Sequence, residues 1–478
     1  MMFSEVTFKR YGSSSLFLLI AVLFIVLVDI YVINYGISYR EVIVVSGVLA
    51  GLVAFAAGER GLKVGLVFLV LTFGLGYRTM HLSPTVSVHP SELVLWGLFA
   101  LPILQPANWR QRKATIWLPY WLLLFIPFWI WAWLRGLSAG LQWDEMFNEF
   151  RNFLLLVPLF IVTELVLADR TNWRHLLLAF YCTGTFIAGM GVLEYTVPEI
   201  KSVFSAFITQ PEASETPERF ARAIFSFWGA PAATFILVLS APVAIVVWHW
   251  WSKSWQRVLT VLALAVQVLG IYIGGYRSMW MVSTAELLVF GILRRKPLLA
   301  AACLLLPLAG TWLLPAQAQN RALSGIFLLT GNPQSIDTSG IKRWDRITTA
   351  LTATFDQPLG HGWAAAGWVH NDFVQVAANL GVLAGLLFAG AFLFTLWRVL
   401  RRVLIPCLAD DQYLGLALLL SFIGAGAILA MEGVEVLVQL VLPVWFVWVL
   451  VEVWLRQRPK PRRVFNDTPA YIRTTANV

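Results

Sequence analysis

Long apolar runs separated by short polar segments make up most of the chain. A helix needs about 20 mainly apolar residues to cross a bilayer, so runs of this length predict membrane-spanning helices. We predict about 12–14 of them, with spans at residues 16–34, 41–57, 61–77, 92–104, 116–134, 151–167, 175–197, 230–249, 256–273, 277–293, 297–314, 372–397, 412–431 and 434–455. The expected fold class is an all-α polytopic membrane protein in which residues 1–478 form a single integral membrane domain.

Two segments between the predicted spans, residues 198–229 and 315–371, are too long to be simple turns. Loops of this length in a compact protein are usually functional or disordered. Both contain Pro, Gly, aromatic residues and short amphipathic stretches, so we expect ordered loops with short helices. The two halves of the chain share no evident repeat, which argues against a fold built from inverted duplication.

The composition agrees with a membrane protein, because 59% of the 478 residues are apolar and 13% are charged. A soluble domain has about 45–50% apolar and about 25% charged residues. A soluble enzyme and a disordered chain are therefore excluded. The three cysteines, Cys182, Cys303 and Cys407, are too far apart to form a disulfide framework or a zinc site.

The charge of the chain is distributed in the way that membrane topology requires. The net charge is +9, but the cations lie between apolar segments and not on one soluble face, so no nucleic-acid partner is expected. With a cytoplasmic N-terminus, alternate loops place 23 of the 35 Lys and Arg residues inside and 12 outside. We therefore predict that both termini, including a tail at 456–478, are cytoplasmic. The first apolar run lacks a small-residue cleavage site, so no cleavable signal peptide is expected.

Eight of the twelve predicted outer cations fall in the two long segments and one tight turn: Lys201, Arg219, Arg222, Arg277, Arg321, Lys342, Arg343 and Arg346. Guanidinium groups bind phosphate and diphosphate through paired N–H donors, so these residues indicate an anionic ligand. For most of them a solvated loop charge is the alternative. Arg222 and Arg277 lie directly beside apolar runs, where a cation needs an anion, a carbonyl cluster or a cavity, or else snorkels to the interface.

The second long segment also contains a candidate general base. His370 precedes Asn371 and Asp372 at the predicted start of a span, where either of these two residues can cap the helix. An imidazole there can take a proton from a sugar hydroxyl, because its pKa is close to neutral. The alternative is an interfacial histidine that only hydrogen-bonds a carbonyl. For His361, in a glycine-flanked turn, we favour a structural role.

Three groups of residues resemble one known family. They are Ser339-Gly340-Ile341-Lys342-Arg343-Trp344 followed by Pro358-Leu359-Gly360-His361-Gly362 and His370-Asn371-Asp372-Phe373; Arg222 ahead of Gly229 and Pro231; and Tyr276-Arg277-Ser278. Together they are similar to the signature of the O-antigen ligase and polymerase superfamily, over roughly residues 220–395. The rest of the chain resembles the family only as a polytopic scaffold.

The resemblance implies a bacterial inner-membrane glycosyltransferase that moves a glycan from undecaprenyl diphosphate to an acceptor hydroxyl at the periplasmic face. By motif, Arg222 and Arg277 would bind the donor diphosphate and His370 would be the catalytic base, with Arg343, Asp372 and Arg219 as further candidate substrate-binding residues. The reaction would invert the anomeric centre without a metal ion or another cofactor. Membrane lipids would surround the protein.

The acceptor stays open. An O-antigen ligase would transfer polysaccharide to lipid A core sugar, a polymerase would use a second lipid-linked glycan, and a third variant would glycosylate protein. From another class, a transporter or flippase of lipid-linked sugars would use intramembrane carboxylates such as Asp29, Glu164 and Glu286. A structural membrane partner without activity is the remaining alternative.

Overall fold

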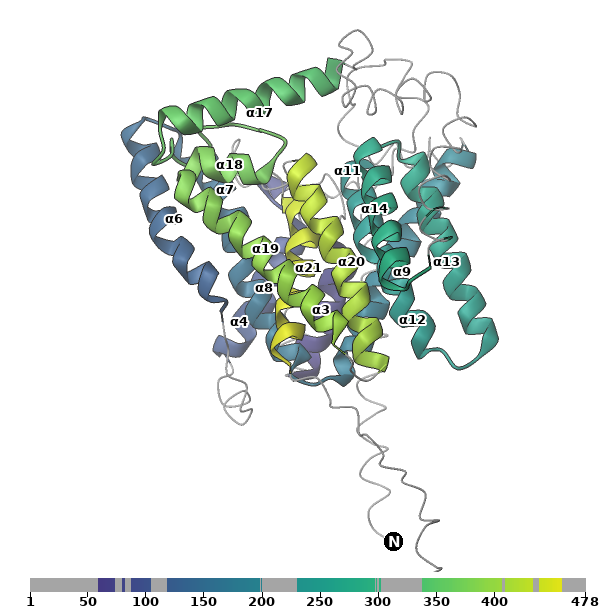
Figure 1. Cartoon of the computed structure of the whole chain (residues 1–478). Helices are drawn as coiled ribbons and strands as arrows, with labels where there is room; N and C mark the ends of the chain where they lie inside the picture. Colours follow the sequence, from purple (N-terminus) through teal and green to yellow (C-terminus); the bar gives the residue numbers. More distant parts are fainter. Residues whose placement is uncertain are drawn as a thin grey trace, which may run out of the picture.

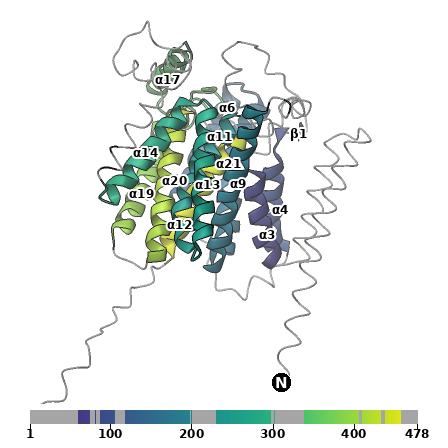
Figure 2. The ribbon, with the colours of Figure 1, turned by 90° about the vertical axis from the view of Figure 1, so that its right-hand side faces the viewer.

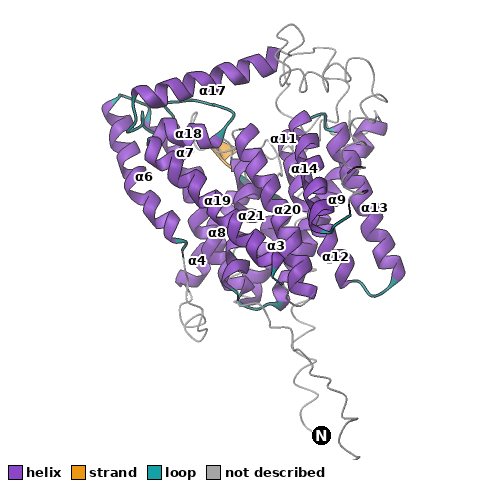
Figure 3. Cartoon of the chain, in the orientation of Figure 1, coloured by secondary structure: helices purple, strands orange, loops and turns teal. Residues whose placement is uncertain are grey.

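The computed structural model describes residues 59–73, 80–81, 87–104, 118–197, 199, 230–296, 298, 301, 338–405, 409–432 and 438–457. In this part of the chain, helices packed side by side form a bundle, and one further helix lies across an end of it (Figures 1 and 3). Two paired strands of two residues each are the described β-structure, with Met80 opposite Val88 and His81 opposite Ser87. The protein is therefore an all-α polytopic membrane protein.

In chain order the described elements are α3 (Glu59–Thr72), β1 (Met80–His81), β2 (Ser87–Val88), α4 (Pro90–Leu104), α6 (Tyr120–Ser138), α7 (Trp143–Leu154), α8 (Leu156–Leu167), α9 (Thr171–Thr196), α11 (Ala230–Ser240), the 3-10 helix η2 (Ala241–Val243), α12 (Ala244–Trp250), α13 (Ser254–Ile273), α14 (Arg277–Leu293), α17 (Thr338–Asp356), α18 (Asp372–Leu380), α19 (Val382–Leu404), α20 (Ala409–Met431) and α21 (Val438–Arg456).

Seven helices among the described residues are long and apolar enough to cross a membrane: Tyr120–Ser138, Trp143–Leu167, Thr171–Thr196, Ala232–Trp250, Ser254–Ile273, Val382–Leu404 and Asp411–Met431. Two apolar helices, Ser91–Ile103 and Ser278–Leu293, are shorter, as the predicted spans 92–104 and 277–293 were. The predicted spans 16–34 and 41–57, and 297–314 apart from residues 298 and 301, lie outside the described residues. The number of 12–14 spans therefore stays a prediction.

The predicted span 372–397 is wrong as a single helix, because it is divided into α18 and α19. Gly381 lies between the two helices with φ +105°. A Cβ atom there would lie 2.9 Å from the Pro358 carbonyl oxygen, which accepts a hydrogen bond from Val382 N at 2.9 Å. The helix breaks because the segment after α17 packs against its backbone at this point.

Two other predicted boundaries need correction. The span 151–167 begins earlier, at Trp143, and is interrupted at Leu155, three residues before Pro158. Proline lacks the N–H group that would bond the carbonyl of residue 154, which explains the interruption. In the predicted loop 315–371, α17 has 19 residues and is longer than the short helices expected. Within the predicted loop 198–229, the described residue is Glu199.

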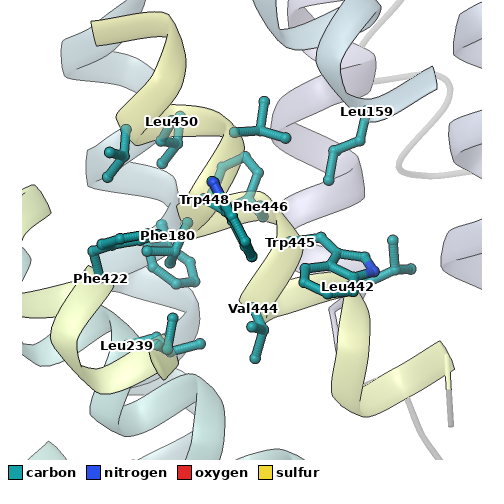
Figure 4. Close-up of a cluster of buried hydrophobic side chains, with 14 of the residues drawn as sticks. Leu159, Phe180, Leu239, Phe422, Leu442, Val444, Trp445, Phe446, Trp448 and Leu450 are labelled. Atoms are coloured by element: carbon teal, nitrogen blue, oxygen red, sulfur yellow. The ribbon is translucent and has the colours of Figure 1, made fainter. Parts of the chain in front are cut away.

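The core of the bundle is built around α21, which is apolar on nearly all sides, as a helix surrounded by other helices should be. Its Trp445 and Trp448 are fully buried, and Figure 4 shows them among aromatic and aliphatic side chains of the neighbouring helices. Trp121 stacks on Trp448 with ring centroids 4.8 Å apart. Trp445 donates through Nε1 to the carbonyl of Asn152 at 3.0 Å. These contacts fix α21 against α6 and α7.

The bundle has two chemically different ends. We call one the basic end; its described cations are Arg60, Lys63, Arg170, Arg174, Lys253, Arg257, Arg294, Arg295, Lys296, Arg398, Arg401, Arg402 and Arg456. The other, the site end, consists of the turns at 139–142 and 274–276, the segment 357–371, the C-terminal end of α20, and α17, which lies across it in Figure 1 and is seen nearly end-on above it in Figure 2. Which side of the membrane each end faces stays a prediction.

Candidate functional site

Glu432, directly after α20, is the centre of the polar contacts at the site end. It is buried, with 5% of its surface exposed. Its Oε1 atom accepts from Arg343 Nη1 at 3.1 Å and from the hydroxyl of Ser278. Its backbone carbonyl accepts from Trp368 Nε1 at 3.2 Å. A single residue therefore connects α17, the first turn of α14 and the segment that carries His370.

Helix α17 supplies two guanidinium groups because its lower face packs on α18. Ile347 and Ala350 contact a small apolar cluster that includes Val369 and Ala378. Since side chains three or four residues apart share a helix face, Arg343 and Arg346 also approach the bundle. Arg343 pairs with Glu432 and contacts the Met431 carbonyl at 3.4 Å, whereas Arg346 is exposed and reaches the Trp368 carbonyl at 3.5 Å.

His370 lies beside these two cations. Arg346 Nη1 is 3.3 Å from His370 Nε2. Because a guanidinium has no acceptor, Nε2 is the unprotonated nitrogen of this contact. The imidazole ring faces the Trp368 ring with centroids 4.4 Å apart, and its backbone has a positive φ of 61°, which is uncommon for a residue other than glycine.

The surroundings of His370 keep its side chain neutral. Burial, and after it the positive charges of Arg343 and Arg346, lower the pKa of His370 from 6.5 to about 4, while the carbonyl of Glu432 opposes the shift. Nδ1 is buried without a hydrogen-bond partner of standard geometry among the described residues. The residue is therefore uncharged at neutral pH, with a lone pair on Nε2 that can accept a proton. A pKa of about 4 makes it a weak base as long as both guanidinium groups face it, because a general base works best with a pKa near the working pH.

The start of α18 fixes the place of His370 along the chain. Asn371 has an extended backbone and accepts a hydrogen bond from Val374 N at 3.0 Å, so it caps α18 as predicted. Its Nδ2 atom donates to the carbonyl of Ala430 at 2.8 Å, which attaches this cap to α20. The side chain of Asp372 is buried within the protein.

A second buried carboxylate, Glu149 in α7, binds both α18 and the segment 357–371. Oε1 accepts from Gln375 Nε2 at 2.8 Å and from Asn379 Nδ2 at 2.6 Å, and Oε2 accepts from Ala364 N. Such a buried carboxylate is stable only when donors satisfy it. Trp363 adds a further anchor, because its ring is buried and Nε1 donates to the Trp129 carbonyl at 3.2 Å.

The structure brings some of the predicted site residues together. Arg343 and His370 lie around Glu432, and Arg277 is the first residue of α14, next to Ser278, which bonds Glu432. Arg219 and Arg222 lie outside the described residues. His361 has the structural role expected of it, since Nε2 contacts the Ala353 carbonyl at 2.9 Å.

Sequence reasoning did not single out Glu432, Glu149 or the contact of Arg346 with His370. A signal for Glu432 was available: it is an acidic residue at the end of an apolar span, on the predicted side of the outer arginines. Glu149 gave the same signal, since it directly precedes the predicted span 151–167 in a predicted outer loop, but its partners, more than 200 residues away, could not be read from the sequence.

The described residues contain no group of three or more His, Cys, Asp or Glu side chains that could hold a metal ion. Comparisons of the sequence with models of known protein families and with curated protein sequences give no match. The fold and the contacts around Glu432 define the class of protein: a polytopic helical membrane protein with a cationic, histidine-containing site at one end of its bundle.

Proposed function

We propose that the protein is a polyprenyl-diphosphate-dependent glycosyltransferase, and specifically an O-antigen ligase that transfers polysaccharide from undecaprenyl diphosphate to lipid A core sugar. The observation that supports this is the convergence of Arg343, Arg346, His370 and the start of α14 at one end of a membrane-spanning bundle. Two guanidiniums suit a diphosphate, and a neutral imidazole beside them suits an acceptor hydroxyl.

In the proposed reaction the acceptor oxygen attacks the anomeric carbon while the bond from that carbon to the diphosphate oxygen breaks. The hydroxyl proton passes to Nε2 of His370, and undecaprenyl diphosphate leaves with one additional negative charge. Arginines at the site, with Arg222 and Arg277 as further donor ligands, stabilise this charge by preorganised electrostatics. No redox step is required.

The contact between Arg346 and His370 gives the reaction an order. In the ligand-free protein Arg346 occupies the lone pair of Nε2. A bound diphosphate attracts the exposed Arg346 guanidinium more strongly than a neutral imidazole does, because both partners are then charged. Donor binding therefore frees Nε2 and raises the pKa of His370 before the acceptor hydroxyl is deprotonated.

In this proposal the protein lies in the bacterial inner membrane, with both termini in the cytoplasm and the site end at the periplasmic face. The basic end supports that orientation, because Lys and Arg concentrate in cytoplasmic loops. The donor's lipid tail would remain among membrane lipids while its diphosphate reaches the arginines.

The test measures glycan transfer by the purified protein in nanodiscs, with EDTA present throughout. An undecaprenyl-diphosphate glycan is the donor, and delipidated core or a second donor molecule is the acceptor. Product mass identifies the acceptor. We expect transfer that withstands EDTA, is lost in His370→Ala, and has a donor KM raised about tenfold or more in Arg346→Ala. Lys342→Ala is the matched control, since it removes an exposed cation of the same helix.

A product that contains two joined repeat units would assign the polymerase activity instead, with the same residues in the same roles. A full effect of Lys342→Ala, equal to that of Arg346→Ala, would show that only the net charge of α17 matters. No product with any acceptor would contradict the proposal.

A transporter of lipid-linked sugars is the second candidate, favoured by Glu286. This carboxylate is buried in α14 against Gly424 of α20, and its Oε1 has no hydrogen-bond partner among the described residues. Glu164, by contrast, pairs with Arg456 at 3.2 Å. Loss of lipid-linked sugar movement across vesicles in Glu286→Gln, with full movement in His370→Ala, would favour the transporter and exclude the enzyme.

A further inference from the structure

Helix α17 has three different faces. Its lower face, with Arg343, Ile347 and Ala350, packs toward the bundle. On the outer face Asp345 and Thr349 are exposed and polar. Between these faces runs an exposed apolar stripe, which consists of Ile341, Trp344, Leu351 and Phe355.

The stripe is too apolar for a surface that faces water. The Phe355 side chain is 74% exposed and Trp344 is 62% exposed. Residues 344, 351 and 355 recur at helical spacing, so the stripe is continuous along more than two turns. A contiguous exposed apolar surface of this kind marks contact with a membrane or a partner.

The apolar stripe continues directly into the membrane-facing surface of α6. Leu359, just after α17, is exposed, and its carbonyl accepts from Trp131 Nε1 of α6 at 2.8 Å. Trp131 lies among exposed apolar residues of this candidate span, including Ile130 and Leu134. Lipid must cover that part of α6, so the adjoining stripe lies at the same boundary.

We infer that α17 is an interfacial helix whose apolar stripe is immersed in the lipid headgroup and upper acyl region, with its polar outer face in water. Its orientation across the end of the bundle in Figures 1 and 2 agrees with a helix in the membrane plane. An amphipathic helix with aromatic residues on its apolar side and polar residues on another side has this preference. A protein partner of α17 would not require continuity with the surface of α6.

The lipid contact sets the height of the guanidinium groups. Arg343 and Arg346 belong to the same rigid helix as the stripe, so they are held at headgroup level. The diphosphate of a lipid-linked donor lies at the same level of the membrane. This consequence rests on the proposed function; the inferred lipid contact of α17 does not.

The experiment uses full-length protein in which Cys182, Cys303 and Cys407 are replaced by serine. An environment-sensitive fluorophore is attached at Phe355→Cys in the apolar stripe. The matched control carries the same fluorophore at Thr349→Cys on the polar face. In nanodiscs we expect nitroxide-labelled lipid to quench the label at 355 about twofold or more strongly than the label at 349. Iodide in the water should show the reverse preference. Leu351→Cys repeats the measurement if the first variant does not fold.

Equal quenching of both sites by iodide would overturn the inference, because the stripe would then face water. Protection of the label at 355 from both quenchers would also overturn it, because protein would then cover the stripe. Neither outcome depends on transfer activity, so a failed transfer assay and a failed lipid contact remain distinguishable.

Discussion

The two ends of the bundle use their charged residues differently. At the basic end, cations stack on rings or form single ion pairs: Arg402 lies 4.0 Å from the Trp454 ring centroid, Arg170 lies 3.8 Å from Asp411, and Arg398 lies 3.2 Å from the buried Glu452. At the site end, carboxylates are buried and satisfied by several donors from distant segments. Glu452 is bonded from one helix, α19, whereas Glu432 and Glu149 each join several segments, so the carboxylates of the site end fix the relative positions of more of the chain.

The backbone shows the same contrast. In the segment 357–371 of the site end, His370 and Ala364 have positive φ values, as do Gly360, Gly362 and Gly367. At the basic end Arg295 is a residue with this conformation. Uncommon backbone conformations persist only where surrounding contacts determine them, and they concentrate at functional sites.

The largest expected difference between the two ends comes from removing one histidine at each of them. We expect His370→Ala to lower kcat/KM for glycan transfer by about 10²–10⁴-fold, the usual contribution of a general base. His175→Ala, an exposed histidine near the basic end, should leave the rate unchanged. Transfer rates of the two variants in parallel check this prediction. Equal small effects would remove His370 from the mechanism.

Next in size is the effect of the carboxylates on stability. Glu149→Ala leaves two buried donors and one partly buried donor without an acceptor. Each buried donor costs about 1–3 kcal/mol, so the free energy of unfolding should fall by about 3 kcal/mol or more. Glu164→Ala removes a partly exposed ion pair with Arg456 and should cost about 1 kcal/mol or less. Thermal unfolding of both variants in one detergent measures the difference. A similar decrease in both would show that the site end is no more tightly built than the basic end.

A smaller effect separates two glycines of one segment. At Gly362, with φ +107°, a Cβ atom would lie 2.5 Å from the Gly136 backbone nitrogen, whereas at Gly367, with φ +62°, nothing lies within 4 Å. Gly367→Ala therefore costs only the strain of a left-handed residue, about 1–2 kcal/mol. Gly362→Ala must also displace backbone, so its melting temperature should be the lower of the two. The reverse order would contradict the close packing of this segment on α6.

The smallest effect concerns pH. The unfolded chain protonates His370 near pH 6.5, but the folded protein does so only near its pKa of about 4. The stabilisation from the neutral imidazole is therefore complete above about pH 6.5 and is lost as the pH falls toward 4. Arg346→Gln removes a nearby positive charge, so the pKa should rise. In this variant the acidic limb of the plot of kcat/KM against pH should shift to higher pH. An unchanged limb would show that another group titrates there.

Local chemistry made part of this arrangement predictable from the sequence. The Asn371 cap follows from an amide side chain ahead of a helical run. The break at Gly381 did not follow, because the backbone that approaches it belongs to Pro358, across a segment with no regular structure. Arg343 was a candidate by motif, but its carboxylate partner Glu432 is 89 residues away. Contacts at that separation depend on how the spans pack, which apolar periodicity alone does not determine.

The C-terminal end of α20 acts as a common reference point for the site. Three consecutive residues there, Ala430, Met431 and Glu432, receive contacts from Asn371, Trp368, Arg343 and Ser278. When α20 tilts in a thinner or thicker bilayer, the groups attached to its end move together. We therefore expect the distances among Arg343, Asn371 and Ser278 to change little with bilayer thickness, so the proposed transfer should proceed at similar rates in short-chain and long-chain lipids.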